Sequence, residues 1–210
     1  MGSAPDSITD ALLVLRLMAV ADAPAVAERS GRPQPETERV LAHLAQSGWA
    51  SYRSGRFPGW MLTAQGRAEG ERRLGAELDE AGGRASVVAL YGQFLVLNPE
   101  VLRVASAWQV RTVNGVDVPN DHADEGHDSA VIAELEALHR RAEGLLAELE
   151  SPLPRLAGYR PRLSLALARV RSGEGDWFVR PGVDSYHTVW FELHENLLAT
   201  LGRRRNDGID

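Results

Sequence analysis

The segment Asn120–Asp128 concentrates the side chains best suited to acid–base or metal chemistry. It reads Asn-Asp-His-Ala-Asp-Glu-Gly-His-Asp, and His187 and His194 supply further imidazoles later in the chain. Imidazole and carboxylate groups could together hold a metal ion. Their spacing matches no metal motif, however, and Asp124 or Asp128 can instead cap the helix that follows. We therefore predict no metal ion and no cofactor.

Enzymatic catalysis is a second chemistry to weigh for this loop. Proton transfer could use its acids and imidazoles, namely Asp121, His122, Asp124, His127 and Asp128. The chain has no cysteine, no glycine-rich phosphate loop, no Gly-x-Ser-x-Gly and no His-Glu-x-x-His, so nothing identifies a nucleophile. The sequence predicts a protein that is not an enzyme, with no catalytic residue.

A small-molecule cavity usually combines aromatic walls with a few polar groups, and several residues fit that description. The helix expected from Asp184-Ser185 to Leu201 is apolar over most of its circumference. Such a helix is buried in a core, lies against a partner subunit, or forms a cavity wall. An arginine and the histidines could hold a carboxylate or phosphate of an effector. The ligand-binding candidates are Trp108, Arg111, His122, Tyr186, His187, Trp190 and His194.

The stretch Pro33–Thr63 combines a short helix, two strands and a basic turn, which suits contact with double-stranded DNA. Arginine pairs with guanine and glutamine with adenine in the major groove, so Gln34, Arg39 and His43 are base-reading candidates. Arg53 and Arg56 at a hairpin tip would reach phosphates or a minor groove. The alternative is a solvated helix face. The full DNA-binding set is Arg32, Gln34, Thr37, Arg39, His43, Arg53 and Arg56.

Charge is distributed unevenly along the chain. The net charge is −6, which by itself argues against a general nucleic-acid binder. Six arginines and two glutamates lie between Arg29 and Arg67, a local balance of +4, whereas residues 85–210 carry 13 arginines and 18 acids. A basic region on an acidic protein suits DNA contact at one end of the molecule.

The elements that would position the DNA-binding residues follow from caps and periodicity. A helix is expected from Ser7, a second from Asp22 with Pro24 in its first turn and Gly31 at its end, and a third from Pro35. Two strands and their turn occupy residues 49–62. Thr63 caps a helix that ends before Gly82-Gly83, and this glycine pair is the predicted domain boundary.

The rest of the chain is predicted to be almost entirely helical. We expect helices over 87–97, from Asn98-Pro99, over 128–150, over 161–171 and over 185–201, with a hairpin around Asn114-Gly115. The fold class is mainly α with a small β wing. Residues 1–83 form a winged helix-turn-helix DNA-binding domain, and residues 84–210 form an all-helical domain for dimerisation and effector binding.

The first part resembles the winged-helix core of MarR-type regulators over about residues 10–80. The resemblance is carried by Ala25-Val-Ala27, Ser30-Gly31, Pro35-Glu-Thr37, Val40-Leu41, Leu44, Gly48-Trp49, Arg53 and Leu62-Thr63-x-x-Gly66-Arg67. It implies a homodimer that binds a palindromic operator and releases it on binding a small molecule. The chain departs from the family in having little sequence before the winged helix and a long C-terminal region after it.

Location and alternative functions follow from what the sequence lacks. No apolar run approaches the roughly 20 residues of a membrane span, and the start has no signal-peptide pattern, so a cytoplasmic protein without membrane contact is expected. The preferred function is a ligand-responsive repressor. Alternatives are a FadR/GntR-like sensor of a metal or metabolite, and a winged-helix interaction module that does not bind DNA.

Overall fold

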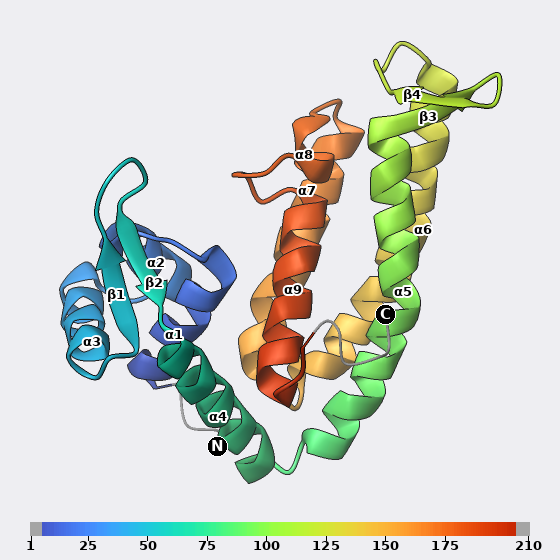
Figure 1. The fold of residues 1–210 in the computed structure, drawn as a ribbon. Helices are drawn as coiled ribbons and strands as arrows, with labels where there is room; N and C mark the ends of the chain where they lie inside the picture. Colours follow the sequence, from blue (N-terminus) through green and yellow to red (C-terminus); the bar gives the residue numbers. More distant parts are fainter. Residues whose placement is uncertain (1–5, 205–210) are drawn as a thin grey trace. The chain divides into compact units, whose positions relative to one another are not determined.

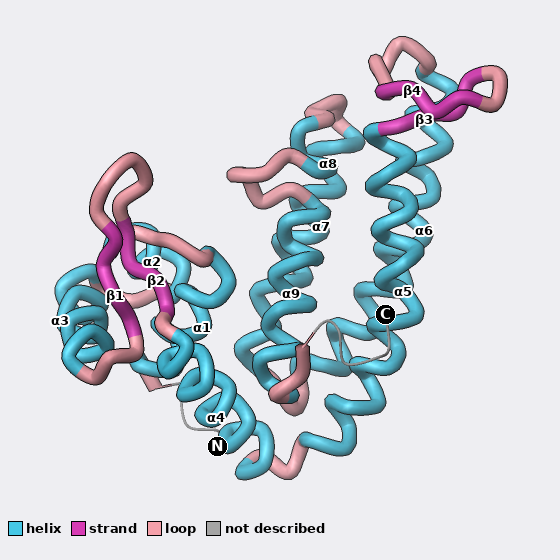
Figure 2. Tube along the Cα trace, in the orientation of Figure 1, coloured by secondary structure: helices cyan, strands magenta, loops and turns pink. Residues whose placement is uncertain are grey.

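The computed structural model describes residues 6–204, which are mainly helical with two small two-stranded sheets (Figure 1, Figure 2). The chain divides into two compact units. The first extends to Arg84 and includes the segment from Glu195, and the second is Ala85–His194. The expected boundary after residue 83 lies one residue from this division. The residues from Glu195 group with the first unit, although the sequence placed them in the second domain.

The first unit begins with three short helices, α1 (Ser7–Met18), α2 (Ala23–Ser30) and α3 (Gln34–Gln46). The backbone N–H of Ile8 donates to Asp6, and that of Ala25 donates to Asp22, so aspartates cap the first two helices. Gly31 ends α2 in the left-handed conformation, with φ 67°. The Asp22 and Gly31 predictions are confirmed, whereas α1 is capped by Asp6 one residue before the predicted cap.

An antiparallel hairpin follows α3, formed by β1 (Ala50–Arg53) and β2 (Gly59–Leu62). Ala21 adds a third, single-residue strand: its N–H donates to the carbonyl of Trp60, and the N–H of Trp60 donates back to Ala21. The sequence analysis missed this bridge because one residue carries no alternation pattern. The segment between α1 and α2 is therefore tied to the hairpin.

The core of the first unit lies under α1, α2, α3 and the hairpin. Leu12 and Leu15 of α1 meet Val26 of α2 and Leu41 and Leu44 of α3, and all five are almost fully buried. These positions are the apolar stripes that helical spacing predicts. The packing leaves the opposite side of α3 in solvent.

The helix α4 (Ala64–Glu80) begins at a tightly built junction with the hairpin. The hydroxyl of Thr63 accepts from the N–H of Gly66, which confirms the predicted cap, and donates to the carbonyl of Gly48 at 2.7 Å. A Cβ on Gly66 would lie 1.8 Å from the carbonyl oxygen of Trp49. Only glycine fits here, which gives the Leu-Thr-x-x-Gly motif a physical reason.

The second unit contains a long first helix, a hairpin, and further helices that pack against one another. These are α5 (Arg84–Gln109), β3 (Val110–Val113), β4 (Val116–Pro119), α6 (Glu125–Glu150), the 3-10 helix η1 (Pro154–Gly158), α7 (Tyr159–Arg171), α8 (Asp176–Val179) and the part of α9 (Tyr186–Leu201) up to His194. The Asn114-Gly115 turn has positive φ at both residues, as predicted for its type. This hairpin means that the unit is not all-helical.

Pro99 lies inside α5, so the prediction of two helices separated at Asn98-Pro99 is wrong. Proline removes one backbone hydrogen bond from a helix and favours a break. Here buried residues continue in helical spacing on both sides of it, including Phe94, Leu97, Val101 and Val104. Tertiary packing of this face outweighs the local preference.

The core of the second unit is built around aromatic side chains. Phe94 of α5 stacks on Trp190 of α9 at 4.7 Å between ring centroids, and the indole N–H of Trp190 donates to Asn98. His139 of α6 lies within 3.3 Å of the Tyr186 hydroxyl. The face of α9 considered for a partner subunit is therefore buried within the chain, although Phe191 on the same helix is exposed.

Among the described residues, α5 is the one helix whose length and composition alone would allow it to cross a membrane. The same helix contributes a row of core side chains to the second unit, as the central helix of a folded domain does. Only 33% of the most apolar 18-residue segment of this helix is buried, so part of its apolar surface faces outward.

Candidate nucleic-acid interface and ligand cavity

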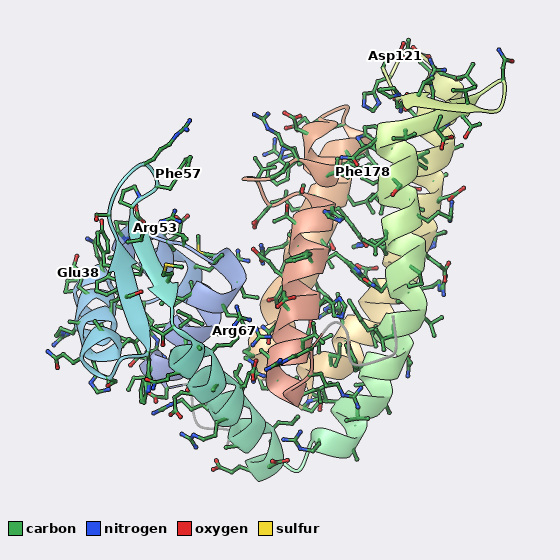
Figure 3. The ribbon with its side chains drawn as sticks, viewed as in Figure 1. Glu38, Arg53, Phe57, Arg67, Asp121 and Phe178 are labelled. Atoms are coloured by element: carbon green, nitrogen blue, oxygen red, sulfur yellow. The ribbon has the colours of Figure 1, made fainter. Side chains whose placement is uncertain are left out.

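The exposed side of α3 carries the predicted base-reading residues. Gln34, Arg39 and His43 are all exposed, on the side opposite the buried Leu41 and Leu44. The amide of Gln34 donates to Glu38 at 2.8 Å, and the guanidinium of Arg39 donates to the carbonyl of Pro35 at 3.1 Å. These are weak, solvent-accessible bonds that a nucleic-acid base could replace. Figure 3 shows Glu38 on the outer side of this helix.

Thr37 does not belong to this exposed surface. It is 3% exposed, and its hydroxyl donates to the carbonyl of Pro33. Its position in the helix, one turn before Leu41, places it on the core face. We therefore remove Thr37 from the candidate DNA contacts.

Arg32 holds the turn between α2 and α3 against α1. Its guanidinium donates to Asp10 at 2.6 and 2.8 Å and to Glu36 at 3.1 Å. Burial raises the pKa of the Asp10 carboxyl, and the pairing with Arg32 acts in the opposite direction. Arg32 is thus engaged within the unit, and the structure gives it a positioning role rather than a free phosphate contact.

The tip of the first hairpin presents two arginines and two exposed aromatic rings. Arg53 donates twice to the carbonyl of Phe57, at 3.0 and 2.8 Å, and the guanidinium of Arg56 lies over the Phe57 ring. Phe57 and Tyr52 are 63% and 56% exposed. Figure 3 shows Arg53 and Phe57 on this hairpin. Neither ring was among the predicted site residues, although the position of Phe57 inside a turn was a signal that it would be exposed; Tyr52 lies in β1.

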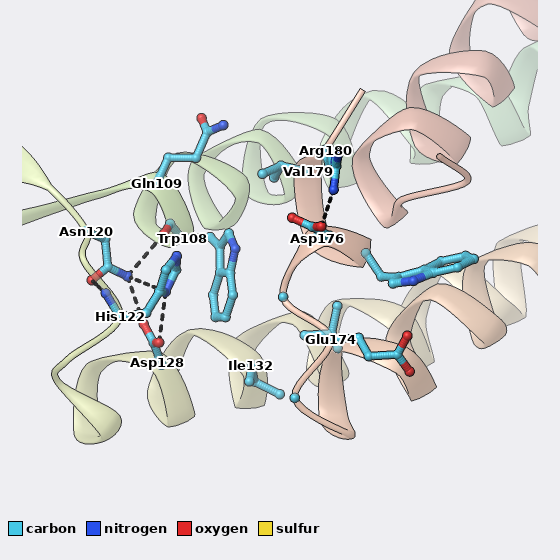
Figure 4. Close-up of a pocket in the computed structure, with 14 residues that line it drawn as sticks. Trp108, Gln109, Asn120, His122, Asp128, Ile132, Glu174, Asp176, Val179 and Arg180 are labelled. Carbon is cyan, nitrogen blue, oxygen red and sulfur yellow. Dashed lines mark hydrogen bonds and ion pairs between the residues drawn. The ribbon is translucent and has the colours of Figure 1, made fainter. Parts of the chain in front are cut away.

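The second unit contains a cavity of about 870 Å³ beside Trp108. Its walls come from the end of α5, the loop before α6, α6 itself, the end of α7, the loop after it and α8 (Figure 4). The lining residues are Trp108, Gln109, Asn120, His122, Asp128, Ile132, Val170, Gly173, Glu174, Gly175, Asp176, Trp177, Val179 and Arg180. This volume is in the range of pockets that hold drug-sized ligands.

One wall of the cavity is a hydrogen-bonded polar cluster. His122 Nδ1 lies 2.9 Å from Asp128 Oδ2, and the Asn120 amide donates to Asp128 Oδ1 at 2.8 Å and to the carbonyl of Trp108 at 3.1 Å (Figure 4). His122 has φ 58°, which is uncommon for a residue other than glycine. Because the carboxylate of Asp128 can only accept, Nδ1 of His122 carries the proton, and Nε2 keeps its lone pair when the ring is neutral.

The wall next to this cluster is aromatic and closely packed. Trp108 lies between the ring of His122, at 4.5 Å, and that of Phe178, at 4.7 Å. A Cβ on Gly175 would come within 3.1 Å of Trp108 Cζ2, so the loop backbone passes directly beside the indole. Figure 3 shows Phe178 within the helical unit. Trp108 is only 7% exposed and is held in one position.

The predicted ligand-binding residues divide between this cavity and other places. Trp108 and His122 line it together. Arg111 lies outside its wall and pairs with Asp121 at 3.0 Å, and Tyr186, Trp190 and His194 are buried in the core. The last three sit on the apolar face of α9, which packs inward. They and His187 do not line the cavity.

The acids and histidines of residues 120–128 form hydrogen bonds with one another and with the nearby backbone. Asp124 caps α6 by accepting from the N–H of His127, and His127 Nε2 lies 2.9 Å from the carbonyl of Ala107. The N–H of Ala123 and the charge of Arg111 lower the pKa of Asp121. Within residues 6–204, no three histidine or acidic side chains are grouped so that they could hold a metal ion.

The segment Gly173–Arg180 was absent from the predicted site. Its composition, Gly-Glu-Gly-Asp-Trp-Phe-Val-Arg, mixes glycines, charges and aromatic residues. That mixture was the available signal, because such a segment can approach a ligand closely with its backbone. Arg180 pairs with Asp176, and Arg169 lies over the ring of Trp177.

Comparison with known proteins found no protein-family model, no curated protein and no solved structure that matches this chain.

Proposed function

We propose that this protein is a DNA-binding transcription regulator whose first unit is a winged helix. The observation that carries the proposal is the pairing of Ala21 with Trp60. With this pairing, the first unit has the order α1, a single-residue strand at Ala21, α2, α3, β1, a hairpin turn and β2. In that arrangement the second of the paired helices, here α3, is the one that enters the major groove.

The exposed side chains of α3 have the chemistry for reading bases. Arg39 could donate two hydrogen bonds to guanine, and Gln34 could pair with adenine. Glu38, which now accepts from Gln34, could accept from the amino group of cytosine instead. Arg53 and Arg56 on the hairpin would contact phosphates, which fixes the register of the helix on the duplex.

A regulator of this kind reads a palindrome with two reading helices about 34 Å apart, so we propose a homodimer. The outward side of α5 supports this proposal. Val88, Val96 and Leu102 are exposed there, and the exposed Ala89 and Gly92 between them would let a second α5 approach closely. A second copy of the chain would remove this apolar surface from water.

Response to a small molecule is the remaining part of the proposal. The cavity beside Trp108 supports it, because the cavity is large enough for an effector and has both aromatic and polar walls. Effector binding would change the distance between the two reading helices and release the operator. The regulator would then act as a repressor in the cytoplasm.

The exposed rings of Tyr52 and Phe57 favour one other candidate, a winged helix that binds a protein. Exposed aromatic residues are common at protein interfaces. The same rings can also lie against a DNA backbone. The local positive charge between Arg29 and Arg67 favours DNA.

The test compares two arginines on DNA selected from a random-sequence pool. Arg39→Ala should relax the preference at one base position and cost about 1–3 kcal/mol there. Arg56→Ala should weaken binding about equally on all sequences. It should also reduce the slope of log affinity against log salt concentration by the amount that corresponds to about one phosphate contact. Arg171→Ala, on the exposed surface of α7 in the second unit, is the control. Unchanged affinity in both test variants would overturn the proposal.

A further inference from the structure

The cavity beside Trp108 has a chemical character that narrows the class of its ligand. Its acidic lining residues are Asp128, Glu174 and Asp176, and its only arginine is Arg180. Two of these acids have arginine partners, because Glu174 accepts from Arg169 at 2.9 and 3.0 Å and Asp176 pairs with Arg180. An anionic ligand would meet the carboxylate of Asp128 and would find Arg180 already engaged. The arginine expected to hold an anion, Arg111, pairs with Asp121 outside the lining.

The polar wall presents a hydrogen-bond acceptor. The Nδ1 edge of His122 is turned to Asp128 and Asn120 (Figure 4), so Nε2 lies on the other side of the ring. Within the described residues, Nε2 of His122 has no hydrogen-bond partner. A neutral imidazole held by a carboxylate at one nitrogen is a good acceptor at the other.

The aromatic wall favours a flat ligand. Trp108 and Trp177 both line the cavity, and Ile132, Val170 and Val179 add apolar surface. Indole rings bind planar molecules by stacking and attract positive charge at their faces. Trp108 is packed between His122 and Phe178 and is only 7% exposed, so both faces of its ring are covered. Of the two indoles, the half-buried Trp177 is therefore the one on which a ligand can stack.

We propose that this cavity binds a flat aromatic molecule that carries an amino group as donor and no negative charge. The amino group donates to Nε2 of His122, and the rings stack against Trp177. The role of this molecule as an effector rests on the proposed regulator function, but its binding to the cavity does not. The test therefore uses the full-length protein without DNA.

Three probes with the same ring system are compared: 9-aminoacridine, which has a donor and is a cation at neutral pH, acridine, which is neutral and has no amino donor, and acridine-9-carboxylate, which is an anion. The His122→Phe variant then isolates the part of the binding that depends on the donor. Calorimetric titration should give the tightest binding for 9-aminoacridine, about ten-fold weaker binding for acridine, and the weakest for the carboxylate. His122→Phe keeps a ring against Trp108 but removes the acceptor. It should lower the affinity for 9-aminoacridine to that for acridine and leave acridine unchanged.

His127→Gln is the matched control, because His127 lies nearby in the first turn of α6 and contacts Ala107 instead of the cavity. It should leave all three affinities unchanged. Thermal melting of each variant without ligand establishes that it is folded. Tighter binding of the carboxylate than of the amine, or equal loss of both acridine and 9-aminoacridine in His122→Phe, would overturn the proposal.

If 9-aminoacridine binds as expected but does not change operator affinity, the ligand site stands and the effector role fails. If DNA binding is absent altogether, the titration still decides the ligand class, because it contains no DNA.

Discussion

Gly66 at the start of α4 lies directly against the carbonyl oxygen of Trp49, at a separation that leaves no room for a Cβ. The contact joins the first residue after the α3 turn to the helix that follows the hairpin. Thr63 strengthens the same junction through its bonds to Gly48 and Gly66. The orientation of the hairpin relative to α3 depends on this contact.

Gly66→Ala should therefore destabilise the first unit by about 3 kcal/mol, because a Cβ meets backbone that cannot move aside. Urea denaturation followed by tryptophan fluorescence measures the loss. The control is Gly144→Ala in α6, where a Cβ meets nothing within 4 Å. That variant should gain about 0.5–1 kcal/mol. Equal stability of the two variants would contradict the close contact.

The buried His139 makes stability depend on pH. Burial lowers its pKa below the ordinary value of 6.5, and the weaker effect of Glu143 acts in the opposite direction. Between the folded and unfolded pKa values the unfolded chain binds more protons, so stability falls as the pH decreases from above 6.5. The decrease ends once the pH is below the folded pKa.

His139→Gln should flatten this dependence. Urea denaturation at pH 7.5, 6.5 and 5.5 should show a wild-type stability that declines more steeply than that of the variant. The exposed His43→Gln should keep the wild-type slope. An identical slope in His139→Gln and wild type would show that His139 titrates normally in the folded protein.

Arg32 and Asp10 should be energetically coupled in the folded state. A double-mutant cycle with Arg32→Ala and Asp10→Ala should give a coupling energy of about 1–2 kcal/mol, because both side chains are partly buried and doubly hydrogen-bonded. A cycle of Arg56→Ala with Asp10→Ala should give none. Additive effects in the first cycle would return Arg32 to the set of free DNA contacts.

Val96 on the outward side of α5 should be essential for the homodimer. Val96→Glu would bury a carboxylate at the interface and weaken dimerisation by about ten-fold or more. Val116→Glu is a matched control, since Val96 and Val116 are both 62% exposed and Val116 lies on β4. Sedimentation equilibrium measures the dimer dissociation constant of each variant. Equal association of the two variants would exclude this face of α5 as the interface.

Much of the local structure could be predicted because its signals are local. Asp22, Gly31, Thr63 and the Asn114-Gly115 turn each set a helix end or a reversal by their own chemistry, and the structure confirms them. Pro99 was misjudged because the packing that holds α5 together is not local. The bridge at Ala21 was missed because its partner, Trp60, lies far along the chain.

The candidate cavity was predicted only in part for the same reason. Trp108 and His122 stood out by residue type, and they do lie together. The loop from Gly173 joins them only through the packing of α7 against α6, which no spacing in the sequence reveals. Tyr186, Trp190 and His194 share an aromatic and polar character with a ligand site, but the same character serves a packed core.

Selection of bound fragments from genomic DNA by the purified full-length protein tests whether α3 reads DNA. We expect enrichment of two-fold symmetric sites whose half-sites are separated by about one helical turn. Arg39→Ala should lose the preference at one position of each half-site. Recovery of fragments with no shared sequence, or of none above background, would contradict the assignment of α3 as a DNA-reading helix.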